Sequence, residues 1–319
     1  MPKSAHKRPA TQASRARVAW RATRALVHIG LGVAVCTLAF PMLSRRRRAR
    51  IVSWWARGFL AALGMRLQQH GAWPSTAGRY LLVSNHITWL DIFVIHAVEP
   101  VRFVSKSEVR SWPLAGYLAT RAGTLYVDRA RKRDTIDIGV QMHDVMAGGE
   151  AVGVFPEGTT SDGSVLLPFF SPLLQPAVRC QASLVPAGVR YRRTDGSTNT
   201  DLAFIGDQTF LQSVQVTLRQ PDTRVEVRLG APISCAGLHR RELTRLAEDA
   251  VAELLEVSVD HDWQASGTSG KADGTPPRHA RSRRAAEARA DAVAMVEAET
   301  AAGAATRTDP RSEPAKDSP

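Results

Sequence analysis

The chain has 319 residues, of which 44% are hydrophobic and 23% are charged, a composition typical of a globular protein with a core of its own. Its formal net charge of +12 at pH 7 predicts an anionic partner, which is a phospholipid surface, a phosphorylated substrate or nucleic acid. The three cysteines, at 36, 180 and 235, are too widely spaced for a disulfide framework or a zinc site. The histidines show no ligand spacing either, so we expect no metal and a reducing, cytoplasmic setting.

The first 24 residues form a basic arm, because the chain contains no Asp or Glu before Asp91. Residues 25–43 carry no charge and end at an arginine-rich run, 45–50. This uncharged stretch is about long enough to cross a hydrocarbon core. A secretory signal is disfavoured because no cleavage motif is present and arginines follow at once, whereas a buried core helix is the plainer alternative. Because basic residues flank the uncharged stretch on both sides, its orientation is not determined. A helix that spans the membrane and a monotopic insertion are both alternatives.

Residues 51–67 add a second segment that mixes apolar and aromatic residues. Trp54 and Trp55 suit a headgroup boundary, and Leu60, Leu63 and Leu67 fall at helical spacing, as on an interfacial amphipathic helix. The same stripe is equally typical of a core helix. Its position directly after the uncharged stretch favours the membrane, so we expect a membrane-attached helical segment over residues 25–70.

The middle of the chain, residues 71–258, alternates short apolar strands with helical patterns. Strands are expected at 79–84, 101–106, 123–128, 150–156, 182–191 and 223–230, and helices at 134–146, 171–181, 206–218 and 238–255. Such alternation predicts an α/β domain with a mixed central sheet flanked by helices, whose sites gather at the carboxyl ends of strands. Residues 259–319 are rich in Ala, Gly, Pro and charge, which predicts a disordered tail apart from an Ala-rich helix near 284–302.

The stretch S-N-H-I-T-W-L-D at 84–91 directly follows an apolar strand. His86 and Asp91 are not neighbours on a regular helix, but a histidine on the turn and an aspartate in the first turn of the next helix can meet. Asp91 would then accept the Nδ1 hydrogen and leave Nε2 as a base. No Ser or Cys stands in a G-x-S-x-G setting, so the pair fits direct deprotonation of a substrate hydroxyl. By itself this spacing also recurs by chance, beside ordinary loop histidines.

Three further stretches carry polar groups at strand ends. The sequence V-F-P-E-G-T-T-S-D-G at 154–163 has the hydroxyls and glycines that present donors to a phosphate, with Glu157 organising the loop or gripping a substrate hydroxyl. An ordinary Gly-rich turn is the alternative. Arg129 stands just past a strand, where an arginine holds a phosphate bidentately. Pro186 interrupts an apolar strand, which implies a sheet edge or a bend.

Taken in order, N-H-x-x-x-x-D, F-V-S-K…Y-V-D-R, F-P-E-G-T and V-P-A-G-V-R-Y resemble the glycerolipid acyltransferase family over residues 25–255, most closely the bacterial 1-acyl-sn-glycerol-3-phosphate acyltransferases. The resemblance implies acyl transfer from acyl-CoA or acyl-carrier protein to the sn-2 hydroxyl of lysophosphatidate. His86 would be the general base and Asp91 its orienting partner. The substrate-binding residues it implies are Asn85, Lys106, Arg129, Glu157, Gly158, Thr159 and Pro186, where Asn85 shapes the turn and Pro186 is structural or lies near the acyl donor.

One departure from the family pattern bears on the acceptor. Many members of the family carry Arg after F-P-E-G-T, but this chain has Thr160. Acylation of another lysolipid, such as lyso-ornithine lipid, is therefore the alternative. A non-catalytic binder of anionic membrane surface is the alternative of a different class, whereas no nucleic-acid motif is present. The resemblance implies an enzyme at the cytoplasmic face of a bacterial inner membrane and says nothing about its oligomeric state.

Overall fold

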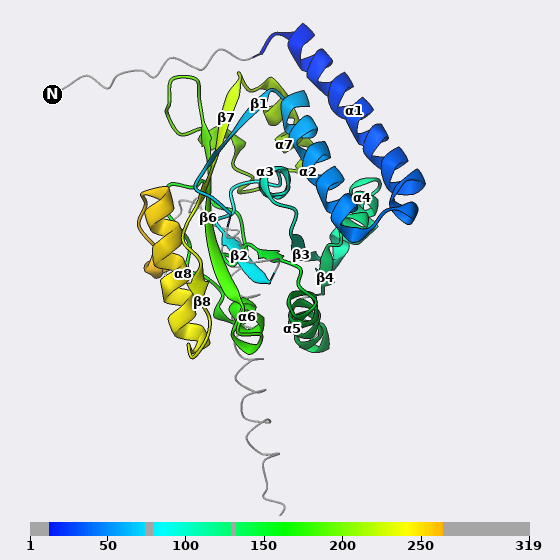
Figure 1. Cartoon of the computed structure of the whole chain (residues 1–319). Coiled ribbons are helices and arrows are strands. Elements are labelled where there is room, and N and C mark those ends of the chain that lie inside the picture. Colours follow the sequence, from blue (N-terminus) through cyan, green and yellow to red (C-terminus); the bar gives the residue numbers. More distant parts are fainter. Residues whose placement is uncertain (1–12, 74–78, 129–131, 264–319) are drawn as a thin grey trace, which may run out of the picture.

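A computed structural model describes residues 13–73, 79–128 and 132–263. The chain forms a mixed sheet with helices on both faces (Figure 1), which confirms the predicted fold class. The predicted disordered tail starts at residue 259, but Val259 forms a bridge with Leu166 and the N–H of Asp260 donates to the Leu166 carbonyl at 2.9 Å, so the prediction is wrong for residues 259–263. The rest of the predicted tail, its Ala-rich helix and Arg129 lie outside the described residues.

The sheet has the strand order β1-β7-β6-β2-β5-β3-β4, with β8 paired to β6. Its strands are β1 Met65–His70, β2 Tyr80–Ser84, β3 Arg102–Lys106, β4 Leu125–Val127, β5 Val152–Val154, β6 Ser183–Arg192, β7 Thr223–Leu229 and β8 Ile233–Ser234. Neighbouring strands run parallel from β6 through β2, β5 and β3 to β4, whereas β7 and β8 run antiparallel to β6. The carboxyl ends of β2, β5, β3 and β4 therefore share one edge of the sheet.

The helices cover two faces, and each face has its own core. They are α1 Arg15–Leu38, α2 Arg45–Ala62, α3 Asp91–Val98, α4 Ala115–Arg121, α5 Lys132–Ala147, α6 Gln175–Arg179, α7 Phe210–Arg219 and α8 Arg240–Leu255, with short 3-10 turns η1 Phe40–Met42, η2 Ser107–Ser111, η3 Ser171–Leu174 and η4 Thr200–Leu202. Leu82 of β2 joins the core under α2 and α3, and Leu81 joins the core under α5 and α8. Successive strand residues point to opposite faces, so β2 is apolar throughout.

The expected helix over residues 51–67 is wrong at its carboxyl end. Helix α2 ends at Ala62, and Gly64 has a positive φ of 82°, a conformation that suits glycine after a helix. The chain then enters β1, where Leu67 pairs with Val225 of β7 in a parallel ladder. Helical spacing of three leucines did not reveal this strand, because its partner lies more than 150 residues away in the sequence.

Pro186 was expected at a sheet edge or a bend, and the sheet edge is wrong because β6 is a central strand. On one side of β6 it stands in register with Val83 of β2. On the other side β8 pairs with β6 at Leu184, and β7 begins its pairing at Ala187. The carbonyl of Pro186 accepts from the N–H of Gly230, just past β7, at 2.9 Å, and the proline has no N–H to donate in return.

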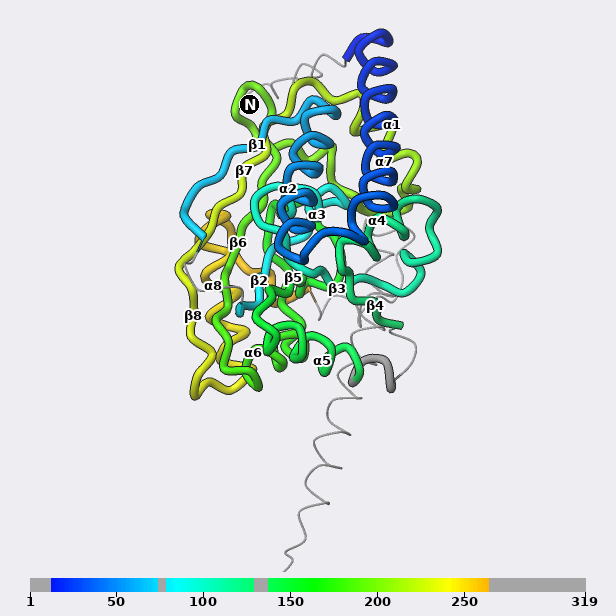
Figure 2. Tube along the Cα trace, turned by 45° about the vertical axis from the view of Figure 1, so that its right-hand side comes forward, coloured from blue at the N-terminus to red at the C-terminus, as the bar shows by residue number. Residues whose placement is uncertain are grey.

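Helix α1 lies along the outside of α2 and is tied to the domain along its length (Figures 1 and 2). Arg21 is 3% exposed and donates to the carbonyl of Gln220 at 2.5 Å and to Asp222 at 2.8 Å. The indole of Trp55 in α2 stacks on His28, with ring centroids 5.2 Å apart. Among the described residues, α1 is the helix that is long and apolar enough to cross a membrane. Length and composition alone are weak support for a membrane-spanning role.

Candidate active site

The site predicted from sequence lies at the shared carboxyl edge of the parallel strands. His86 follows β2, Glu157 follows the neighbouring β5, and Lys106 ends β3, the next strand along. Because adjacent strands are about 4.8 Å apart, these three positions fall within roughly 10 Å along the edge. Arg129 follows β4, the fourth strand of this row, but lies outside the described residues.

His86 and Asp91 meet across the loop between β2 and α3. The Nδ1 atom of His86 lies 2.8 Å from Oδ2 of Asp91. The aspartate side chain is fully buried, whereas the imidazole keeps 21% of its surface exposed. Asp91 is the first residue of α3, so its carboxylate also lies at the positive end of the helix dipole. The carboxylate therefore holds the ring through Nδ1, and Nε2 is the ring nitrogen on the side away from Asp91.

Three more donors hold Asp91 in place. The backbone N–H groups of Ile87 and Thr88 donate to Oδ2 at 2.7 and 2.9 Å, and the hydroxyl of Tyr191 donates to Oδ1 at 2.6 Å. Burial, with Asp91 beside it, raises the pKa of Tyr191 well above its usual value, so the phenol keeps its proton. Sequence reasoning did not single out Tyr191. It closes V-P-A-G-V-R-Y, but nothing in that block signals a partner 100 positions away.

The F-P-E segment after β5 supports His86 from two sides. Glu157 is fully buried and accepts hydrogen bonds from the backbone N–H of His86 at 2.6 Å and of Leu167 at 3.1 Å. The ring of Phe155 stacks on the imidazole, with centroids 4.1 Å apart and planes 9° apart. Of the two functions expected for Glu157, these contacts favour the organising one.

The remaining predicted residues lie around this pair. Asn85 clamps the backbone of Val189 in β6, donating to its carbonyl at 3.0 Å and accepting from its N–H at 2.8 Å. Gly158 has a positive φ of 70°, which turns the loop before the half-buried Thr159. Thr160 donates its hydroxyl to the carbonyl of Phe204. The substrate-binding functions of Asn85, Lys106, Glu157, Gly158, Thr159 and Pro186 stay predictions.

This arrangement has the parts of general base catalysis. A buried carboxylate that accepts four hydrogen bonds orients a partly exposed imidazole, which is the arrangement that general base catalysis requires. The stacked Phe155 keeps water from one face of the ring. Among residues 13–73, 79–128 and 132–263 no group of three or more His, Cys, Asp or Glu side chains is placed to hold a metal ion.

Comparisons with known proteins show the family of the chain. The family model described as Acyltransferase matches residues 66–190. The chain is 36% identical to a lyso-ornithine lipid O-acyltransferase of Pseudomonas aeruginosa over 76% of this chain and 95% of that protein. It is 34% identical to a 1-acyl-sn-glycerol-3-phosphate acyltransferase of Neisseria meningitidis, over 67% of this chain and 83% of the other.

A solved structure shares the fold. The crystal structure of a 1-acyl-sn-glycerophosphate acyltransferase from Thermotoga maritima superimposes with a TM-score of 0.56 and covers 80% of this chain and 97% of its own. Its sequence identity is 19%, so this likeness concerns the fold alone.

Proposed function

The chain belongs to the acyltransferase family whose members acylate lysophospholipids, and from this premise we propose that it transfers an acyl group from a thioester to the free hydroxyl of a lysolipid. The observation that carries the proposal is the hydrogen bond between His86 Nδ1 and the buried Asp91 at the carboxyl end of β2. A non-catalytic membrane binder would have no use for a carboxylate that four donors hold behind a partly exposed histidine.

The proposed reaction begins when Nε2 of His86 takes the proton of the acceptor hydroxyl as its oxygen attacks the thioester carbonyl. The carbonyl π electrons move to oxygen, and a tetrahedral oxyanion forms. This oxyanion then collapses, the carbon–sulfur bond breaks, and the thiolate leaves with the proton from the imidazolium. Asp91 stabilises the imidazolium between these steps, so that the products are an ester and a neutral thiol.

Lyso-ornithine lipid is the acceptor we favour. Thr160 stands where many members of the family carry Arg, and its hydroxyl is bonded to the carbonyl of Phe204. The loop thus lacks a guanidinium suited to a phosphate. A lyso-ornithine lipid presents a carboxylate and an ammonium instead of a phosphate, and a protein named for that acceptor covers 76% of this chain at 36% identity.

Lysophosphatidate is the second candidate. Lys106 ends β3 with an exposed side chain, two strands from His86, and Arg129 follows the next strand. Two cations at neighbouring strand ends suit a phosphate next to a hydroxyl held at His86. The sn-2 hydroxyl would then be the nucleophile and phosphatidate the product.

We further propose acyl-CoA or acyl-carrier protein as the donor, and the cytoplasmic face of a bacterial inner membrane as the location. Acyl thioesters are found in the cytoplasm. The bacterial relatives named above and the apolar helix α1 support membrane association. The basic amino-terminal region, with no acidic residue before Asp91, would be attracted to anionic lipid.

The test offers lyso-ornithine lipid and lysophosphatidate side by side to the detergent-purified protein, with acyl-CoA and with acyl-carrier protein as donors. We expect thioester-dependent transfer that falls at least about 1,000-fold in His86→Ala, since the base is lost. A preference for lysophosphatidate moves the acceptor to the second candidate, whereas full activity of His86→Ala contradicts the mechanism.

A further inference from the structure

The imidazole of His86 is the first of three aromatic rings that stack on one another. It lies on Phe155, with ring centroids 4.1 Å apart and ring planes 9° apart. Phe155 lies in turn on Phe103, with centroids 5.2 Å apart and planes again 9° apart. We call these three side chains the ring stack. At its far end His96 meets Phe103 edge-on, with centroids 5.1 Å apart. Phe103 is thus one ring removed from the candidate base.

The ring stack crosses three adjacent strands that end at the candidate active site. His86 follows β2, Phe155 directly follows β5, and Phe103 lies inside β3. Phe155 takes the middle position because β5 lies between β2 and β3 in the sheet. Phe103 is 2% exposed and belongs to the core under α2 and α3, whereas the imidazole keeps 21% of its surface exposed. The ring stack therefore connects a partly exposed histidine to a ring that the core holds in place.

Gly153 of β5 makes room for the Phe103 ring. The two residues are in register between β5 and β3. A Cβ atom at Gly153 would lie 2.9 Å from Cε1 of Phe103 and 2.6 Å from Cγ2 of Val101, closer than packed side chains approach. The φ of Gly153 is outside the left-handed region, so the backbone does not require glycine here. A glycine between two valines in a strand is then explained by the close approach of another group.

The ring stack restrains a movement that the bond between His86 and Asp91 leaves free. A hydrogen bond at Nδ1 sets the distance of that nitrogen from the carboxylate, but the plane of the ring can still tilt. Tilting moves Nε2, the atom that takes the proton in the proposed reaction. A tilted imidazole would lose its parallel contact with Phe155, and a fixed Phe103 keeps Phe155 from following the tilt. The tilt matters because a misplacement of about 1 Å at a reacting atom costs about 100-fold in rate.

We propose that Phe103 is a positioning residue, which sets the tilt of the His86 ring through Phe155, and that Gly153 provides the space for it. The effect on rate rests on the proposed function, whereas the orientation of the imidazole does not. A phenylalanine that only filled the core would affect stability and leave the imidazole where it is.

The first experiment measures acyl transfer by detergent-purified Phe103→Leu. We expect kcat to fall about tenfold with the KM for the lysolipid unchanged, since the variant disturbs the position of the base and not the binding of substrate. Phe40→Leu is the matched control, because Phe40 is also 2% exposed but lies in η1, where Arg48 covers its ring. Its kcat should stay at the wild-type level. Equal kcat in the two variants, or a higher KM at constant kcat in Phe103→Leu, would overturn the proposal. Phe103→Met takes its place if Phe103→Leu does not fold.

A double-mutant cycle tests whether Phe103 acts through Phe155. If it does, Phe103→Leu should change kcat by less than about twofold in the Phe155→Leu background, because the middle ring is already missing. A full tenfold loss on top of that of Phe155→Leu would mean that Phe103 reaches the reaction by another route, which contradicts the proposed relay.

The second experiment observes His86 directly, by NMR of protein labelled with 13C at the histidine Cε1. The His86 signal is assigned by its absence in His86→Ala. A proton over the face of an aromatic ring is shielded, so this signal should move downfield in Phe155→Leu. It should also move in Phe103→Leu and in Gly153→Ala, which displaces the Phe103 ring.

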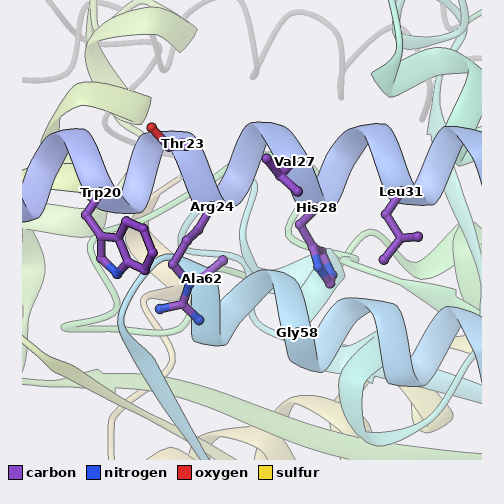
Figure 3. Close-up of a pocket in the computed structure, with 8 residues that line it drawn as sticks. All are labelled: Trp20, Thr23, Arg24, Val27, His28, Leu31, Gly58 and Ala62. Atoms are coloured by element: carbon purple, nitrogen blue, oxygen red, sulfur yellow. The ribbon is translucent and has the colours of Figure 1, made fainter.

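Gly58→Ala is the control for the glycine variant. Figure 3 shows His28 of α1 directed toward Gly58 of α2 in a groove of about 340 Å³, and a Cβ atom at Gly58 would lie 2.5 Å from Cε1 of His28. Gly58→Ala should shift the His28 signal and leave that of His86 unchanged. An unmoved His86 signal in both Phe103→Leu and Gly153→Ala would overturn the proposal. If the wild type transfers no acyl group, the proposed function fails, and the His86 signal alone decides this inference.

Discussion

At the scale of single residues, the site is a histidine that the rest of the molecule holds in one orientation. Asp91 binds Nδ1, Glu157 binds the backbone N–H of His86, and Phe155 stacks on the ring. Each contact restricts the movement of the His86 ring before a substrate binds. Less conformational entropy is then lost on reaching the transition state. The F-P-E segment thus acts through His86, whatever else it contributes to acceptor binding.

Tyr191 gives the sharpest prediction at this scale. Its hydroxyl donates to Oδ1 of Asp91 at 2.6 Å, and the side chain is 1% exposed, so Tyr191→Phe removes one donor and keeps the shape. We expect kcat to fall about tenfold with the KM for the lysolipid unchanged, and the free energy of unfolding to fall by about 1–2 kcal/mol. Steady-state kinetics and urea unfolding measure both.

Tyr126→Phe is the matched control, because that hydroxyl bonds to Thr120 and to the carbonyl of Gly116, not to the His86 pair. It should leave kcat unchanged. A higher KM at constant kcat in Tyr191→Phe would mean that the phenol serves acceptor binding and not the orientation of Asp91.

At the scale of elements, α3 links the site to the core. Its first residue is Asp91, and its later residues pack on α2 and the sheet. His96 lies in its last turn, 6% exposed, with its ring edge-on to Phe103 at a centroid distance of 5.1 Å. Because α3 carries Asp91 at one end and a buried histidine at the other, the stability of the site depends on pH.

We predict that the stability of the protein falls in mild acid because of His96. Burial lowers the pKa of His96 from 6.5 to about 4. Between these values the unfolded chain binds a proton that the folded chain does not. The contribution of His96 is therefore fully present above pH 6.5 and is lost as the pH falls toward 4, by about 3 kcal/mol in total.

Urea unfolding at pH 7.5 and pH 5 measures this effect. His96→Phe should show a smaller decrease between the two pH values than the wild type. His70→Phe, a change at an exposed histidine of β1, should keep the decrease of the wild type. The same decrease in His96→Phe as in the wild type would assign the acid sensitivity to other groups.

At the scale of the whole molecule, charge and apolar surface are distributed unevenly. The net charge is +12, and residues 1–90 contain no acid at all. Exposed apolar side chains on α1 include Trp20, Val27, Leu31 and Leu38, whereas α5, α6 and α8 cover the face of the sheet opposite to α2 and α3. Attraction to an anionic leaflet is thus expected to have an electrostatic part and an apolar part.

We expect salt to separate these two parts. Raising NaCl from about 0.1 M to about 1 M shortens the screening length from about 10 Å to about 3 Å. Flotation with phosphatidylglycerol vesicles should weaken severalfold but persist, because burial of the exposed apolar side chains of α1 does not depend on screening. Complete release at high salt would show that charge alone holds the protein, and no change would show that the arginines contribute nothing.

The sequence by itself determined the features that depend on residues close along the chain. Apolar runs and their spacing predict six of the strands and the helices α5, α6, α7 and α8, but not α4. His86 and Asp91 are predicted as a pair because a strand end and a helix start lie five residues apart. The uncharged stretch from residue 25 to residue 43 likewise predicts much of α1 from composition alone. Such features follow from local conformation and periodicity, which a single sequence displays.

Only the tertiary structure decided which distant groups meet. Tyr191 reaches Asp91 across 100 positions, Glu157 reaches the N–H of His86 across 71, and Arg21 reaches Asp222 across 201. Strand order sets these partners, and it also turned residues 65–70 from an expected helix into β1. The reason is physical: a hydrogen bond or a buried surface needs both of its members, and their separation along the chain carries no information about their separation in the fold.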